Sequence, residues 1–149
     1  LVACGVGAAD PAGCVIKMIT IVLDGTEQVS SSRVNKITVT ESRGLALGWT
    51  LTAQLSGELQ NTNGTVKGPN AEIIAANLRL LNQSCNVVDG PGSAAVPGSP
   101  GTLDAPVTLC SAANGTNAGT FTADADLELT VPASVLAGQY EGVINFIVT

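Results

Sequence analysis

Residues 120–131, with the sequence TFTADADLELTV, alternate between apolar and polar side chains. A period of two is typical of a β-strand with one face in a core and the other in solvent, whereas a helix shows a period of about 3.6. No part of the chain shows a helical period over a useful length. The alternation therefore predicts an all-β chain. One face of this run holds Ala125, Leu127, Leu129 and Val131, and the other holds Asp124, Asp126, Glu128 and Thr130.

Further β-rich runs follow one another, separated by turn residues about every 8–15 positions. Trp49–Ser56 alternates in the same way, Val34–Glu41 is rich in β-branched residues, and Tyr140–Thr149 forms the last run. We expect loops in the Ser-rich Gln28–Arg33 and in the Gly- and Pro-rich Asp89–Pro106. This spacing predicts an antiparallel β-sandwich of about eight or nine strands, with Greek-key or immunoglobulin-like topology.

Composition excludes several classes of function. The 149 residues include no histidine, which removes the usual general base and the usual transition-metal ligand, and no serine or cysteine nucleophile motif is present. We therefore expect no enzyme activity and no cofactor. The net charge of −6 argues against nucleic-acid binding. No apolar run reaches the roughly 18 residues that a membrane span needs.

Four cysteines stand at Cys4, Cys14, Cys85 and Cys110. An even number in a small, Gly-rich chain predicts disulfides and an oxidising compartment. Three pairings are open, and the local one, Cys4–Cys14 with Cys85–Cys110, needs the least folding to explain. A bridge from Cys85 to Cys110 would stabilise the fold by roughly 3.5 kcal/mol on the chain-entropy model. Because the chain begins at Leu1 rather than at a methionine, we expect a secreted, mature protein at the cell surface.

The segment Val15–Leu23 is a nearly continuous apolar run. It predicts a strand that is buried on both faces or covered by a partner. A long apolar strand near an N-terminus can pair with the sheet edge of a neighbouring molecule, so residues 1–33 are expected to form an arm that carries a donor strand. The alternative is an ordinary first strand of the same sandwich. The assembly strand would consist of Val15, Ile16, Met18, Ile19, Ile21, Val22 and Leu23.

Two blocks of sequence resemble the WxL domain family. Residues 37–52, ITVTESRGLALGWTLT, are similar to its strand-turn-strand block, in which a D/E-x-R turn precedes G-W-x-L-T. Residues 127–142 are similar to its C-terminal block L-x-L-x-V-P…A-G-x-Y-x-A/G, and Leu78–Asn82 lies where the family has its middle apolar strand. The resemblance covers residues 34–149. The two WxL-like motifs fall at Trp49 and Leu51, and at Phe146 and Val148, where Phe replaces Trp and Val replaces Leu.

The resemblance implies a β-sandwich outside a Gram-positive bacterium, associated non-covalently with peptidoglycan. It also raises the question of Trp49, the only tryptophan. Its alternation with Leu51 and Leu55 favours a place in the core. The alternative is a wall-binding surface around an exposed Trp49.

Two further groups of residues are weaker candidates for sites. The carboxylates of Asp124, Asp126 and Glu128 share one strand face, where Ca²⁺ could bridge them, although a solvated face is the simpler interpretation. Three N-x-S/T sequons could be glycosylated in an organism that modifies asparagine, although chance occurrence in an Asn-, Thr- and Ser-rich chain is the simpler interpretation. These sequons begin at Asn63, Asn82 and Asn114.

The sequence supports two hypotheses of function. The preferred one is a structural subunit of an extracellular fibre or surface layer, which assembles with itself by β-strand exchange through the N-terminal segment. The alternative is a monomeric cell-wall-binding module of the WxL type, whose partner is the wall glycan. The absence of a catalytic group makes an enzyme the least favoured class.

Overall fold

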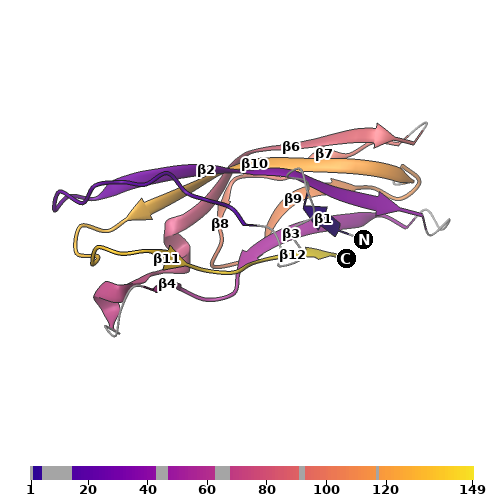
Figure 1. Cartoon of the computed structure of the whole chain (residues 1–149). Helices are drawn as coiled ribbons and strands as arrows, with labels where there is room; N and C mark the ends of the chain where they lie inside the picture. The colour runs from indigo at the N-terminus through magenta and orange to yellow at the C-terminus, as the bar shows by residue number, and fades with distance from the viewer. Residues whose placement is uncertain (1, 5–14, 43–46, 63–67, 91–92, 117) are drawn as a thin grey trace.

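The computed structural model describes residues 2–4, 15–42, 47–62, 68–90, 93–116 and 118–149. The chain forms an elongated β-sandwich, with one long sheet above and shorter strands below it (Figure 1). Every strand pairing in the described part is antiparallel. The prediction of an all-β antiparallel sandwich is therefore confirmed. No helix among the described residues is long and apolar enough to cross a membrane.

The upper sheet contains five strands in the order β1-β2-β10-β6-β8. Its centre is β10, which pairs along most of its length with β2 on one side and β6 on the other. The alternating run 120–131 predicted β10, and the β-branched run Val34–Glu41 predicted the second half of β2. The strands are β1 (Val2–Cys4), β2 (Gln28–Glu41), β10 (Gly119–Val131), β6 (Leu78–Asp89) and β8 (Gly101–Thr102).

The lower layer holds a four-stranded sheet, β12-β3-β9-β7, and a three-stranded sheet, β11-β4-β5. The described residues form twelve strands, more than predicted, because the loop regions contribute two-residue pairings such as β7 and β8. The strands are β12 (Ile144–Val148), β3 (Trp49–Leu55), β9 (Val107–Ala112), β7 (Val96–Pro97), β11 (Tyr140–Glu141), β4 (Leu59–Asn61) and β5 (Glu72–Ile73), with two short 3₁₀ helices, η1 (Pro69–Ala71) and η2 (Ala75–Asn77).

The core lies between the two layers and is built from the inward faces of the alternating strands. In β3 every second residue from Trp49 to Leu55 is buried, and in β10 every second residue from Phe121 to Val131 is buried. Burying aliphatic side chains is the main source of stability in such a sandwich, at about 25 cal/mol for each Å² of apolar surface. The period of two in the sequence is therefore the period of burial.

The Ser-rich stretch Gln28–Arg33 is part of β2 and not the loop that its polarity predicted. Its residues pair with the C-terminal half of β10, from Gln28 opposite Val131 to Arg33 opposite Asp126. Ser30 is buried there, and its hydroxyl donates a hydrogen bond of 2.5 Å to the carbonyl oxygen of Ile19. A buried polar group is tolerated when it is hydrogen-bonded, which is why a serine can occupy this core position.

The predicted strand Val15–Leu23 is not a strand in the structure. The segment runs beside the N-terminal half of β2 (Figure 1), yet one backbone hydrogen bond joins them, from Ile19 N to Ser31 O at 3.1 Å. The hydroxyls of Ser30 and Ser32 bind carbonyl oxygens of the segment instead, at Ile19 and at Lys17. These side-chain bonds take the place of the regular ladder that a strand needs.

Candidate functional site

The first WxL-like motif lies inside the core. Trp49 is only 2% exposed and Leu51 is fully buried, because both belong to the inward face of β3. The indole packs edge-on against the ring of Phe121 in β10, with the ring centroids 4.9 Å apart and the planes at 67°. Trp49 thus joins the two layers of the sandwich. The structure agrees with the core interpretation and leaves no exposed indole for a wall polymer to contact.

The second motif lies directly beside the first. β12 pairs with β3 so that Phe146 faces Ala53 and Val148 faces Leu51. Phe146 and Val148 are half-buried and pack against the core cluster. The two motifs, about a hundred residues apart in the sequence, therefore form neighbouring strands that close one flank of the sandwich. Their role in this chain is to build the fold.

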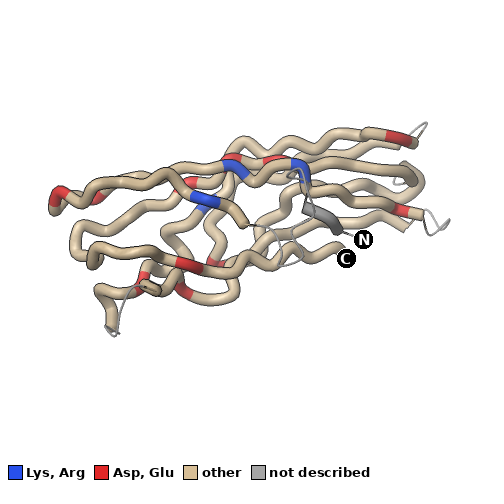
Figure 2. The backbone as a smooth tube through the Cα atoms, in the orientation of Figure 1, with Lys and Arg blue, Asp and Glu red and all other residues tan. Residues whose placement is uncertain are grey.

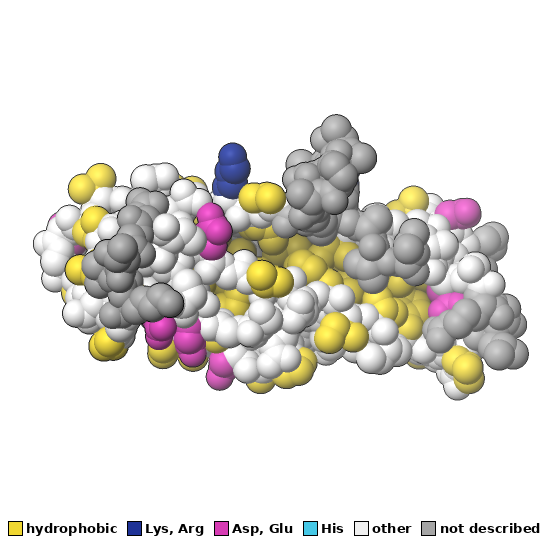
Figure 3. Space-filling model, turned by 60° about the horizontal axis from the view of Figure 1, so that its bottom comes forward, with side chains coloured by type: hydrophobic (Ala, Val, Ile, Leu, Met, Phe, Trp, Pro, Cys, Tyr) yellow, Lys and Arg dark blue, Asp and Glu magenta, His cyan; other side chains and the backbone are white. Residues whose placement is uncertain are grey.

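β12 is the outer strand of its sheet, and no described strand pairs with its other edge. Figure 3 shows hydrophobic side chains gathered in a hollow along the underside of the molecule. Most of the half-buried residues that pack against the core come from β12 and from the segment 15–24, so the core is incompletely covered by strands. Those in these two segments are Ile16, Met18, Ile21, Leu23, Ile144, Phe146 and Val148.

The candidate calcium ligands lie on the outer face of the upper sheet, where they form ion pairs with two arginines. Arg33 reaches both Asp124, at 3.8 Å from Nε to Oδ1, and Asp126, at 3.2 Å from Nη1 to Oδ1. Glu128 pairs with Arg79 at 3.4 Å. No group of three or more potential metal ligands is found in the described part of the chain.

Asp124 and Asp126 also have a structural task. The strands on both sides of β10 contain extra residues at this level, which shift the register. Lys36 and Asn82, in these irregular stretches, adopt left-handed backbone angles, with φ of 52° and 49°. Asp124 accepts a hydrogen bond from the Lys36 amide at 3.4 Å, and Asp126 accepts one from the Asn82 side chain at 2.7 Å. The two carboxylates therefore stabilise the β-bulges at Lys36 and Asn82 in the neighbouring strands.

The charges of the described residues do not form a basic surface. Figure 2 shows the few Lys and Arg residues singly along the chain, with acidic residues distributed among them. The protein as a whole has a net charge of −6 and a calculated pI near 4.3. Such a surface is repelled by polyanions, so any contact with a wall polymer has to rely on hydrogen bonds and apolar surface rather than on cation–anion pairs.

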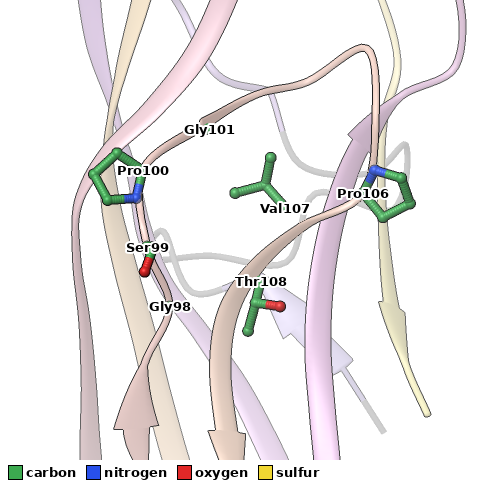
Figure 4. Close-up of a pocket in the computed structure, with 7 residues that line it drawn as sticks. All are labelled: Gly98, Ser99, Pro100, Gly101, Pro106, Val107 and Thr108. Atoms are coloured by element: carbon green, nitrogen blue, oxygen red, sulfur yellow. The ribbon is translucent and has the colours of Figure 1, made fainter.

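The structure contains a recess of about 360 Å³ that sequence reasoning missed. Its lining comes from the stretch between β7 and β8 and from the start of β9 with the proline before it. In Figure 4, the side chain of Val107 lies between the rings of Pro100 and Pro106. No charged residue belongs to the lining. The lining residues are Gly98, Ser99, Pro100, Gly101, Pro106, Val107 and Thr108.

This recess is built on a rigid base. The amide of Gly98 donates to the carbonyl oxygen of Leu109 at 3.1 Å, and a side chain at Gly98 would overlap the carbonyl oxygen of Thr108. Gln83 of β6 donates to the carbonyl oxygen of Ser99 at 2.7 Å, which ties the loop to the upper sheet. The recess is open to solvent, and it presents hydroxyl and backbone groups beside proline and valine surface.

Cys85 and Cys110 form a disulfide, as the local pairing predicted, with Cα atoms 5.5 Å apart. It joins β6 of the upper sheet to β9 of the lower layer, the strand whose first residues line the recess. The predicted partner bridge from Cys4 to Cys14 lies outside the residues whose side chains the structure describes.

The sequons differ in their surroundings. The side chain of Asn82 donates to Asp126, and Asn114 accepts a hydrogen bond from the amide of Gly48 at 3.0 Å. Both residues are exposed, although both amides are engaged within the protein. Asn63 lies outside the described residues. Glycosylation at these positions stays a prediction.

Comparison with known proteins agrees with the resemblance read from the sequence. The family model described as the WxL domain, surface cell wall-binding, matches residues 16–149, which is most of the chain. A search of curated proteins found no match, and a search of solved structures found none either. On the strength of the family match, this chain belongs to the WxL family of surface cell-wall-binding domains.

Proposed function

We propose that the protein is a surface module that attaches non-covalently to the peptidoglycan of the cell wall. The observation that carries this proposal is the family match over residues 16–149. The family match favours the wall-binding module over the fibre subunit that the N-terminal segment suggests, because the family is described as binding the cell wall. The family description also names no reaction, in keeping with a binding role.

The recess beside β9 is the contact that we assign to the wall glycan. The Trp49 ring is buried against Phe121, so the first WxL-like motif offers no aromatic surface on which a sugar could stack. The recess combines the hydroxyls of Ser99 and Thr108 with proline and valine surface and lacks charge. A neutral sugar ring presents hydroxyls at its rim and C–H groups on its faces, which matches this mixed lining.

Sedimentation with purified peptidoglycan, stripped of anionic polymers, tests the function. Saturable co-sedimentation that changes little between low and high salt supports binding through uncharged groups. Absence of saturable binding contradicts the proposed function itself. Binding that disappears in high salt contradicts the recess and points to charged contacts instead.

A pair of matched variants tests the contact separately from the function. Thr108→Glu places a carboxylate in the recess, and Thr122→Glu places one on β10 of the other sheet, at a position that is also half-buried. We expect Thr108→Glu to weaken binding by about tenfold or more, the equivalent of about 1.4 kcal/mol, and Thr122→Glu to leave it unchanged. Equal binding by both variants would remove the recess from the proposal and leave wall binding in place.

A further inference from the structure

The segment 15–24 packs on the core of its own molecule but barely pairs with its backbone. Its half-buried side chains, Ile16, Met18, Ile21 and Leu23, pack against the core. Its backbone, however, shares only one hydrogen bond with the backbone of β2, from Ile19 to Ser31. A segment of this composition, apolar and rich in β-branched residues, can form a regular strand, so the place that it occupies does not use its pairing capacity.

The outer face of the same segment carries three apolar side chains beside the exposed Lys17 and Thr20. Val15, Ile19 and Val22 are exposed by 66%, 63% and 84%. Single exposed hydrophobic residues are common, whereas a group of them marks a surface that a partner can cover. The exposed side chains therefore leave apolar surface that a neighbouring molecule can cover.

One bend connects the segment to β2. Gly25 has a φ of 82°, which favours glycine, and the carboxylate of Asp24 accepts hydrogen bonds from the amide of Thr26 at 2.9 Å and from its hydroxyl at 2.7 Å. Gln28 adds a bond from its side chain to the carbonyl oxygen of Val22 at 2.8 Å. Few interactions hold this bend closed, so straightening it costs little compared with moving any strand of the sandwich.

We propose that residues 15–24 exchange between two copies of this chain, each copy placing its segment on the β2 edge and core of the other. The structure defines the occupant, because the β2 edge and the core already accept this segment within one molecule, and an identical segment presents the same side chains. Exchange keeps these contacts and changes the bend and the entropy of association, and β1, which precedes the segment and pairs with β2, is exchanged with it. It is therefore favoured where copies are concentrated, and the neighbouring copy can cover the exposed Val15, Ile19 and Val22.

Two glycines with the same backbone provide a matched test on the full chain. Gly25 and Gly115 have φ of 82° and 84°, and neither has an atom within 4 Å of an added side chain. Gly25→Val strains the closed bend, whereas Gly115→Val strains the separate turn at Ala113–Thr116 equally. By sedimentation velocity, we expect Gly25→Val to raise the association constant about tenfold, the equivalent of about 1.4 kcal/mol, and Gly115→Val to leave it at the wild-type value. Equal association of the two variants contradicts exchange.

A second measurement does not depend on how the glycine variants fold. One chain carries Ile19→Cys and a second carries Ser31→Cys, two exposed positions joined by the backbone bond. The chains are unfolded and refolded together at high concentration with the native disulfide intact. Exchange predicts a mixed disulfide between the two chains and none when Glu141→Cys replaces Ser31→Cys. No mixed disulfide above this control overturns the proposal. A closed dimer and an open polymer both support it, and neither depends on wall binding.

Discussion

Val148 lies opposite Leu51 in the antiparallel pairing of β12 with β3. Each residue is the last position of one WxL-like motif, so the two copies of the motif meet across a pair of strands. Both contribute to the same core, Leu51 fully buried and Val148 half-buried. The substitutions Trp to Phe and Leu to Val in the second copy fall on an outer strand, where smaller or less enclosed side chains are accommodated.

The first prediction concerns Trp49. Trp49→Ala removes the indole that bridges the layers and should lower the free energy of unfolding by about 3–5 kcal/mol in urea denaturation. Trp49→Phe keeps an aromatic edge near Phe121 and loses no hydrogen bond, because the buried indole N–H has no partner in the described structure. We therefore expect a smaller loss for Trp49→Phe.

The same variants separate a structural Trp49 from a binding one. Under conditions where each variant is folded by circular dichroism, peptidoglycan binding should equal that of the wild type. A folded Trp49→Phe protein that no longer sediments with the wall would show that the indole reaches the ligand, against its 2% exposure.

The second prediction concerns the Cys85–Cys110 bridge. Replacing both cysteines by serine should lower the free energy of unfolding by about 3 kcal/mol, because the disulfide restricts the unfolded chain and joins the two layers. Thermal denaturation of the double variant, beside a variant in which only Cys4 and Cys14 are replaced, measures this. A double variant as stable as the wild type would show that the packing of β6 on β9 is sufficient without the bond.

The third prediction concerns the bulge at Lys36. A left-handed backbone suits glycine and is costly for a β-branched residue. Lys36→Val should therefore be less stable than Lys36→Gly, by about 1–2 kcal/mol in urea denaturation. The neighbouring Thr40, exposed on the same strand, is the control, and there we expect valine to be at least as stable as glycine. The same order at both positions would contradict the bulge.

Much of the fold could be predicted from the sequence, because a strand with one buried and one solvent-exposed face alternates between apolar and polar residues. Trp49–Leu55 and Gly119–Val131 are such strands. The pattern failed where long-range pairing decides the outcome. Gln28–Arg33 is polar, yet β10 pairs with it and Ser30 is buried by a bond to Ile19. Val15–Leu23 has every local property of a strand. Its carbonyl oxygens at Ile19 and Lys17, however, accept hydrogen bonds from serine hydroxyls of β2 in place of a backbone ladder.

The candidate site was less accessible to sequence reasoning than the fold. The recess brings together Gly98–Gly101, a stretch held by bonds to Leu109 and Gln83, and Pro106–Thr108 at the start of β9. Proline and glycine mark such a loop as irregular without indicating its shape. The pairing of the two motifs on adjacent strands could not be predicted either, because the local sequence pattern does not determine the order of strands in a sheet.

The last prediction concerns the bend at Asp24. The hydroxyl of Thr26, and next its amide, hold the pKa of the Asp24 carboxyl below its ordinary value. Because the pKa is lower in the folded state, these bonds contribute fully above the ordinary aspartate pKa of about 3.9 and are lost as the pH falls through the folded value. Following the carboxyl by NMR titration, we expect Thr26→Val, which removes the hydroxyl, to raise the pKa towards the ordinary value. Thr26→Ser, which retains the hydroxyl, should leave it low, and equal pKa values in the two variants would show that the Thr26 hydroxyl does not hold the bend.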